Sequence, residues 1–193
     1  MTAPLKLCLA SASPRRRDLL AQICVAPDAV CPADIDENPT PGELPANHAA
    51  RLAREKAEAA RKTGGGEALY LAADTVVGVG RRILPKAEDE ETARACLQLI
   101  SGRSHRVYTG VALACGDKIS ERLVETRVKV RRLSADDIDA YVASGEWRGK
   151  AGGYAIQGLF ARHVVSIIGS YSNVVGLPLY ETANLLKGAG YTS

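Results

Sequence analysis

Short apolar runs alternate along the chain with longer stretches in which apolar residues recur at helical spacing. Runs rich in aliphatic and β-branched residues predict strands at residues 5–10, 68–79, 105–115, 118–130 and 164–168, of which the first and the last should be buried. The tight-turn sequence Gly116-Asp117 separates the third strand from the fourth, so these two are predicted to form an antiparallel hairpin.

Helices are predicted at residues 15–23, 45–62, 87–100, 135–144 and 178–186. Ser13-Pro14 and Ser134 have the residue types that begin helices at two of these places. Residues 26–45 are rich in Pro, Asp and Asn and predict a long irregular loop, a kind of segment that is often functional. The alternation of helices and strands, with one antiparallel pair, indicates an α/β protein with a mixed sheet.

The chain has 193 residues without internal repeats, low-complexity segments or a break in composition, which predicts a single domain over residues 1–193. Its net charge is +3, and it contains one Trp and one Phe. A nucleic-acid-binding protein usually has a denser basic face with stacking aromatic side chains, so no nucleic-acid partner is expected. The mild basicity suits a small anionic substrate.

The five cysteines are odd in number and include no C-x-x-C pair, which indicates neither a disulfide framework nor a zinc site. They are therefore expected to be reduced thiols of a cytoplasmic protein. The N-terminus has too short an apolar run for a signal peptide, and no run approaches the length of a membrane span, so no membrane partner is expected. The oligomeric state is left open, and a homodimer is compatible with the sequence.

Residues 11–16 have the sequence Ser-Ala-Ser-Pro-Arg-Arg and join a predicted strand to a predicted helix. Backbone N–H groups and the helix dipole favour an anion at such a helix N-terminus. Arg15 and Arg16 would add charge-assisted, bidentate contacts to phosphate oxygens. An ordinary helix cap with two solvated arginines is the competing interpretation.

Asp74 lies inside an otherwise apolar predicted strand, residues 68–79. Burial of a charge there is costly unless a metal ion or a basic partner compensates. A carboxylate in this place is suited to hold Mg²⁺ or to accept a proton from water. The alternative is an aspartate in a turn at the end of a strand. The β-branched run continues on both sides of Asp74, which argues against this alternative.

The glycine-rich segment 149–158 contains Gly-Lys but does not match a phosphate-binding Walker A loop. Only three residues separate Gly145 from Gly149, and Ala151 stands where Ser or Thr is required. The glycines still permit close approach to a ligand, and the Gln157 amide could hydrogen-bond a base edge. A surface loop is the alternative interpretation.

Other polar signals are weak when they are taken one at a time. The acidic stretch 34–37 could supply a metal ligand through Glu37, although acidic loops are more often solvated. Lys56 and Lys86 would ordinarily be surface residues. The three histidines have no metal-ligand spacing and are interpreted as structural or surface residues.

Together, and in this order, these segments resemble the Maf family of nucleotide pyrophosphatases. The matching segments are residues 11–16, Glu37, 51–57, 73–77, Lys86, 101–105 with 109–113, 152–158, and 169–171 through 176–182. The resemblance runs from about residue 7 to about residue 186. Any one motif would be a weak signal, but this many in register are specific.

The resemblance implies hydrolysis of nucleoside triphosphates to monophosphate and pyrophosphate with a divalent cation, Mg²⁺ or else Mn²⁺ or Co²⁺. It implies an inosine-triphosphatase-like fold, in which helices flank a long mixed sheet and a cleft lies between two lobes. Residues 155–158, Ala-Ile-Gln-Gly, resemble the branch that prefers dTTP and UTP. This predicts a nucleotide-pool house-cleaning enzyme. The same chemistry on 7-methyl-GTP or other non-standard purine nucleotides, and a regulatory role in septum formation, stay open as alternatives.

By the same resemblance, Asp74 corresponds to the proposed general base of the family. Arg15, Thr75 and Gln157 correspond to positions tied to substrate choice. The other matching positions hold polar residues that line the cleft: Ser11, Arg16, Glu37, Lys56 and Lys86. One departure falls at the last of these, because the family commonly has Gly-Lys-Pro where this chain has Pro-Lys-Ala.

We hypothesise from these correspondences that the triphosphate lies across the turn at residues 11–16. Its charge would be neutralised by Arg15, Arg16, Lys56 and Lys86. The metal ion would be held by Glu37 and by Asp74, and whether Asp74 is the general base or a metal ligand is left open.

Overall fold

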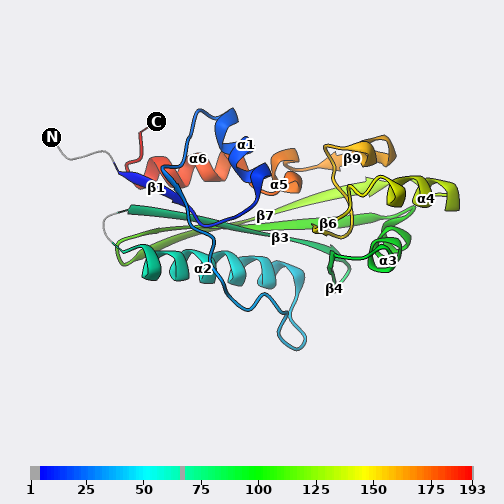
Figure 1. Ribbon diagram of the computed structural model, residues 1–193, viewed down its shortest axis with the longest axis horizontal. Coiled ribbons are helices and arrows are strands. Elements are labelled where there is room, and N and C mark those ends of the chain that lie inside the picture. The colour runs from blue at the N-terminus through cyan, green and yellow to red at the C-terminus, as the bar shows by residue number, and fades with distance from the viewer. Residues whose placement is uncertain (1–4, 66–67, 193) are drawn as a thin grey trace.

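The computed structural model describes residues 5–65 and 68–192. A seven-stranded mixed sheet lies at the centre of the molecule, with strand order β2-β1-β3-β6-β7-β9 and with β4 paired to β3 (Figure 1). Its strands are β1 (Lys6–Leu9), β2 (Ala29–Val30), β3 (Ala68–Val79), β4 (Arg82–Leu84), β6 (Ser104–Cys115), β7 (Lys118–Val130) and β9 (Val164–Ile168). A separate two-stranded sheet pairs β5 (Lys86–Ala87) with β8 (Lys150–Ala151). The predicted α/β fold with a mixed sheet is therefore confirmed.

Helices cover both faces of the large sheet. Their bounds are α1 (Pro14–Gln22), α2 (Pro45–Gly64), α3 (Glu90–Ile100), α4 (Ala135–Ala143), α5 (Tyr171–Val175) and α6 (Leu179–Gly188), with a 3₁₀ turn at Leu159–His163. Helix α2 lies along one face, whereas α1, α5 and α6 lie on the other (Figure 1). Helices α3 and α4 lie together at one end of the long strands β3, β6 and β7.

Helix α2 approaches the sheet closely because its buried face is built from alanines. These residues, at helical spacing, are Ala49, Ala53, Ala57 and Ala60. A Cβ atom at Gly110 of β6 would lie 2.3 Å from the carbonyl oxygen of Ala49, so only glycine fits there. This tight packing holds α2 against the middle of the sheet, where it places one lysine beside β3.

Several predicted elements agree with the structure to within a residue. Strand β3 covers residues 68–79 as predicted, and β6 and β7 form the predicted hairpin around Gly116, whose φ is +54°. Helix α4 begins with a full capping box between Ser134 and Asp137. These elements are long or carry strong terminal signals, which makes them readable from local sequence.

Other predictions need correction. Helix α3 begins at Glu90 and not at residue 87, because Asp89 accepts a hydrogen bond from the Thr92 N–H and caps it. Strand β9 is not buried: it is an edge strand, and Val165 and Ile168 are 56% and 66% exposed. Elements not predicted are β2, β4, β5, β8 and α5, each of at most five residues.

The expectation that all cysteines are reduced is wrong for one pair. Cys8 of β1 and Cys31, which follows β2, form a disulfide with a Cα–Cα distance of 6.3 Å. Cys24, Cys96 and Cys115 are free thiols. Parallel pairing of β1 with β2 brings the two sulfur atoms together across 23 residues of sequence, which spacing alone did not indicate.

The helices of the described residues include none with the length and apolar character needed to cross a membrane.

Candidate active site

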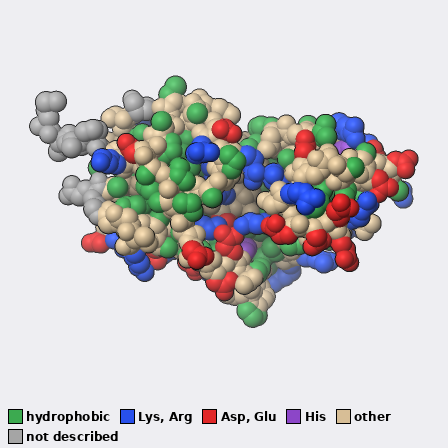
Figure 2. All heavy atoms as spheres, viewed as in Figure 1, with side chains coloured by type: hydrophobic (Ala, Val, Ile, Leu, Met, Phe, Trp, Pro, Cys, Tyr) green, Lys and Arg blue, Asp and Glu red, His purple; other side chains and the backbone are tan. Residues whose placement is uncertain are grey.

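A cavity of about 430 Å³ opens beside the carboxyl end of β1. All nine side chains that the sequence singled out line it: Ser11, Arg15, Arg16, Glu37, Lys56, Asp74, Thr75, Lys86 and Gln157. On the face shown in Figure 2, Lys and Arg side chains gather around a hollow near the middle of the molecule. The fold therefore brings residues from six separate places in the sequence, between residues 11 and 157, to one cavity.

Arg16 is held by three partners from three parts of the chain. Its Nη1 donates to Ser11 Oγ at 2.8 Å, and its Nε donates to the carbonyl oxygen of Gly176 at 2.9 Å. A longer contact of 3.4 Å joins its Nη2 to Thr75 Oγ1. Burial lowers the pKa of Arg16 from its ordinary value, although Asp74 acts in the opposite direction. The interpretation of a solvated arginine is thus wrong at this position.

The N-terminus of α1 faces the same cavity with its first backbone N–H groups uncapped by a side chain. Ser13 is the N-cap residue, but its hydroxyl makes no capping hydrogen bond. Arg15, in the first turn, is partly exposed, and burial lowers its pKa. A helix N-terminus with an arginine beside it favours an anion such as phosphate.

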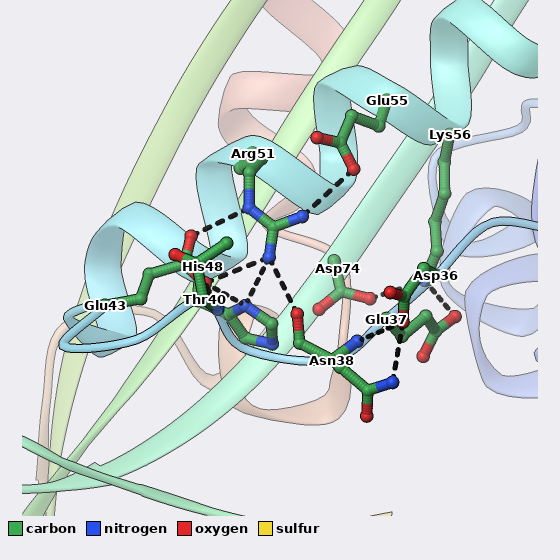
Figure 3. Close-up of polar contacts among 10 residues, drawn as sticks. All are labelled: Asp36, Glu37, Asn38, Thr40, Glu43, His48, Arg51, Glu55, Lys56 and Asp74. Atoms are coloured by element: carbon green, nitrogen blue, oxygen red, sulfur yellow. Dashed lines mark hydrogen bonds and ion pairs between the residues drawn. The ribbon is translucent and has the colours of Figure 1, made fainter.

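A chain of alternating charges crosses the cavity. Lys56 Nζ lies 2.6 Å from Asp74 Oδ1 and 2.6 Å from Glu37 Oε1, and Lys86 Nζ contacts the other oxygen of Glu37. Figure 3 shows Asp74 of β3, Lys56 of α2 and Glu37 of the preceding loop pointing toward one another. Asp74 is in the middle of β3 and only 4% exposed, so the alternative of a strand-end turn is wrong. Its charge is compensated by a buried lysine, as the cost of burial requires.

Glu37 stays ionised over the whole physiological range. Partial burial raises its pKa, but hydrogen bonds from Lys56 and Lys86 outweigh burial and lower the pKa to about 2. The neighbouring acids of the loop do not reach the site: Asp34 is exposed, and Asp36 accepts hydrogen bonds from Asn38. Of the acidic stretch, only Glu37 therefore has the position of a functional group.

The far end of the Glu37 loop is anchored by a second polar cluster, shown in Figure 3. Both oxygens of Glu43 accept hydrogen bonds from Arg51, at 2.8 and 2.9 Å, and His48 Nδ1 lies 2.8 Å from Glu43 Oε2. The Arg51 hydrogen bonds lower the pKa of Glu43 to about 2. Arg51 also donates to the carbonyl oxygen of Asn38, one residue beyond Glu37. This cluster fixes the loop onto α2.

Thr75 and Gln157 differ in how they are held. The Thr75 hydroxyl lies 3.0 Å from the hydroxyl of Thr109, which in turn donates to the carbonyl oxygen of Asn173 at 3.0 Å. Gln157 is exposed, and its amide makes no hydrogen bond within the described residues. Thr75 is therefore preorganised, whereas the Gln157 amide is available to a ligand.

Sequence reasoning missed three residues of the site. Gly176 contributes the carbonyl oxygen that holds Arg16, Thr109 supports Thr75 across the β3–β6 pair, and Lys150 lines the cavity. All three lie in segments that the sequence singled out: Thr109 in 109–113, Lys150 in 149–158 and Gly176 in 176–182. Their roles were missed because Thr109 and Gly176 act through a cross-strand pair and a backbone carbonyl, which local sequence does not reveal, and because Lys150 was considered only as part of a Walker A motif that does not match.

The residues present fit a divalent cation only in part. Within residues 5–65 and 68–192, no group of three or more His, Cys, Asp or Glu side chains converges as metal ligands. Glu37 and Asp74 each place an oxygen 2.6 Å from the same ammonium of Lys56, so two carboxylate oxygens lie close together. Two carboxylates completed by substrate phosphates and water are a usual environment for Mg²⁺ in nucleotide-binding proteins.

The sequence profile of the family described as "Maf-like protein" matches residues 6–189. The chain belongs to this family.

Other Maf-like sequences are similar over nearly their whole length. A protein of Maricaulis maris (strain MCS10) named dTTP/UTP pyrophosphatase is 63% identical over 96% of this chain and 89% of its own. Proteins of the same name from Rhodopseudomonas palustris (strain HaA2) and Caulobacter vibrioides (strain ATCC 19089 / CIP 103742 / CB 15) are 61% and 59% identical. The first covers 96% of this chain and 93% of its own, and the second covers 99% of both.

The Maf-like fold is also similar to a solved structure of low sequence identity. A HAM1 protein from Coxiella burnetii matches 95% of this chain and 99% of its own with a TM-score of 0.53 and 16% identity. This likeness concerns the fold alone, and it agrees with the expected architecture of helices around a long mixed sheet.

Proposed function

We propose that this chain is a nucleoside triphosphate pyrophosphatase that cleaves dTTP and UTP between the α- and β-phosphates in a nucleotide-pool house-cleaning role. The nearly full-length identity of 59–63% to relatives named dTTP/UTP pyrophosphatase carries the proposal. It favours these pyrimidine nucleotides over 7-methyl-GTP or other non-standard purine nucleotides. We place the activity in the cytoplasm, where polymerases draw on the nucleotide pool.

The polyphosphate would bind at the N-terminus of α1. Its backbone N–H groups and Arg15 offer donors to phosphate oxygens, and Lys86 lines the same cavity. Arg16 would act mainly by holding the turn in place, because its donors are already bonded to Ser11, Thr75 and Gly176. Most of the rate gain in such a reaction comes from positioning and charge stabilisation.

Asp74 would orient or deprotonate the attacking water. The water oxygen would form a bond to the α-phosphorus, the bond from that phosphorus to the bridging oxygen would break, and the water proton would pass to the Asp74 carboxylate. Lys56 donates to Asp74 Oδ1 and leaves the other carboxylate oxygen for the water. The negative charge that develops on the leaving pyrophosphate would be stabilised by the cationic side chains that line the cavity.

A divalent cation, if held by Glu37 and Asp74 as their spacing allows, would supply charge neutralisation of the phosphate oxygens. Mg²⁺ is the expected ion. Lys56 contacts both carboxylates, so its ammonium must share them with the ion or move toward the phosphates when the ion enters.

The base would be read by Gln157 with Thr75 nearby. The Gln157 amide carries both donors and acceptors, as the edge of thymine or uracil requires. A site built to hydrogen-bond one base rejects bases that leave its buried polar groups unpaired. The exposed, unbonded amide of Gln157 supports this assignment.

A pyrophosphate-release assay over dTTP, UTP, CTP, GTP, 7-methyl-GTP and ITP, with and without Mg²⁺, tests the proposal. Metal-dependent turnover of dTTP and UTP to the monophosphate is the expected result. Turnover of purine nucleotides alone would contradict the assignment of Gln157 and retain the phosphate chemistry. A folded, metal-supplied protein with no activity on any of the six would overturn the function itself.

A further inference from the structure

Two of the five cationic side chains that line the cavity are held neither by an ion pair nor by a set of several hydrogen bonds. Lys56 and Lys86 are paired with carboxylates, and Arg16 is bonded to three oxygen atoms. Within the part of the chain that the structure describes, Arg15 and Lys150 form no ion pair. Arg15 and Lys150 are therefore the two cations whose donors are most available to a ligand.

The charge balance of the cavity is strongly positive. Five cations line it, and they face only two carboxylates, Glu37 and Asp74, which leaves an excess of three positive charges. The net charge of the whole chain is also +3. The remainder of the molecule is thus neutral on balance, and its positive charge is concentrated where the proposed substrate would bind. Such a concave, cationic site attracts a polyanion.

Lys150 is positioned by a rigid backbone. Strand β8 pairs with β5, so that Lys150 is opposite Ala87, and the Gly149 N–H donates to the Ala87 carbonyl oxygen at 2.8 Å. Three residues before Lys150, Trp147 is fully buried and its Nε1 donates to the carbonyl oxygen of Val142 at 2.8 Å. The backbone of β8 therefore needs no rearrangement to present this lysine to the cavity.

The ammonium of Lys150 has only a neutral partner, the carbonyl oxygen of Arg148 at 3.0 Å. Two charged groups act on it: Arg15 of α1, which is the like charge, and Glu146. Burial lowers the pKa of Lys150 and Arg15 lowers it further, while Glu146 opposes both. The Glu146 carboxylate is already used, since its Oε2 accepts the Leu159 N–H at 2.8 Å. An anion between Lys150 and Arg15 would relieve their repulsion.

We propose that Lys150 is a phosphate-binding residue that clamps the polyphosphate chain of the nucleotide together with Arg15. The assignment rests on the proposed function and deepens it, because it gives the triphosphate a contact in the glycine-rich segment that also carries Gln157. The two residues come from distant parts of the sequence, α1 and β8, so a phosphate bound between them would join α1 to the glycine-rich segment. Bidentate or paired cationic contacts of this kind give strong phosphate binding.

The test measures binding of inorganic tripolyphosphate by titration calorimetry in the presence of a chelator, so that neither a metal ion nor hydrolysis enters. Lys150→Met keeps an unbranched side chain and removes the charge. It should weaken binding by about tenfold or more, as loss of a charge-assisted hydrogen bond does. Lys150→Arg should restore most of the affinity. Lys118→Met, at an exposed lysine that begins β7, is the matched control and should bind as the wild type does.

Unchanged tripolyphosphate affinity in folded Lys150→Met would overturn the assignment, as would an equal loss in Lys118→Met. Circular dichroism and thermal melting establish folding, and Lys150→Gln takes the place of the Met variant if that one fails to fold. Lys150-dependent binding in a protein that hydrolyses no nucleotide would remove the proposed function and keep this assignment. Normal dTTP hydrolysis with unaltered KM in Lys150→Met would overturn the Lys150 assignment and keep the proposed function.

Discussion

At the scale of single residues, Asp74 is defined by the lysine beside it. A carboxylate that is 4% exposed in the middle of a strand would be costly without compensation, and Lys56 Nζ at 2.6 Å supplies it. The same lysine reaches Glu37, so one ammonium organises both acids of the site. Removal of a charge here changes chemistry and electrostatics together, which guides the choice of substitution.

Asp74→Asn should lower kcat for dTTP by at least about 100-fold, the usual contribution of a positioned general base. The amide oxygen of Asn can still accept a hydrogen bond from Lys56, so substrate binding should be largely retained. Steady-state kinetics and calorimetric titration of dTTP on the same preparation separate the two effects. Full activity in this variant would show that another group activates the water.

At the scale of elements, the loop between β2 and α2 carries Glu37 and is tied at both ends. The cluster of Glu43 and Arg51 fastens its far end to α2. At its near end the Cys8–Cys31 disulfide joins it to β1, six residues before Glu37. Strand β2, which directly precedes Cys31, is two residues long and exposed, so its pairing alone would hold the loop only weakly.

Reduction of this disulfide should therefore lower the free energy of unfolding by about 3 kcal/mol, the value typical for a cross-link that closes a loop of this size. Urea unfolding of the oxidised and the dithiothreitol-treated protein measures it, and hydrogen exchange should show faster exchange in residues 28–38. Cys31→Ser should reproduce the reduced state. Cys24→Ser, at an exposed free thiol, is the control. Identical stabilities with and without reductant would contradict the expectation.

At the scale of the whole molecule, buried histidines link stability to pH. His105 is 2% exposed, and its Nε2 lies 2.7 Å from the Tyr154 hydroxyl. Burial lowers the pKa of His105 from 6.5 to about 4. Between those two values the unfolded chain binds a proton that the folded chain does not, so stability rises with pH through this window.

The free energy of unfolding should accordingly fall by up to about 3 kcal/mol as the pH is lowered from 7 to 4, since each pKa unit corresponds to 1.36 kcal/mol. Glu37 and Glu43, whose pKa values are lowered from 4.5 to about 2, begin to lose their contribution as the pH falls below about 4.5 and lose it fully near 2, so the range from pH 7 to 4.5 reports on the histidines. Urea unfolding across the range tests this. His105→Gln should flatten the dependence without abolishing it, because burial also lowers the pKa of His163. A slope unchanged by the substitution would exclude His105 as its source.

Long elements and strong caps were predictable because their signals are local. Strand β3 has twelve consecutive residues of strand character, and α4 begins at a Ser with an Asp three residues on. Strands β5 and β8 were missed because two residues are too few to show the alternation of apolar and polar positions that marks a strand. Each of them forms only by pairing with the other, which lies far away in the sequence. The exposure of β9 was missed because an apolar pentapeptide does not say whether it lies at the edge of a sheet.

The sequence by itself determined the fold class, the family and the nine polar residues that line one cavity, because motif residues keep their order and type along the chain. Only the tertiary structure decided which partner each has. It paired Lys56 with Asp74 across 18 residues of sequence and Lys86 with Glu37 across 49. It also placed Arg16 so that its side chain hydrogen-bonds the carbonyl oxygen of Gly176 and joins two distant segments. In addition, it placed Arg15 and Lys150 in the lining of one cavity, where neither forms an ion pair within the described residues. The reason is physical: charge compensation and burial depend on distances in space, which the spacing of residues along a chain does not specify.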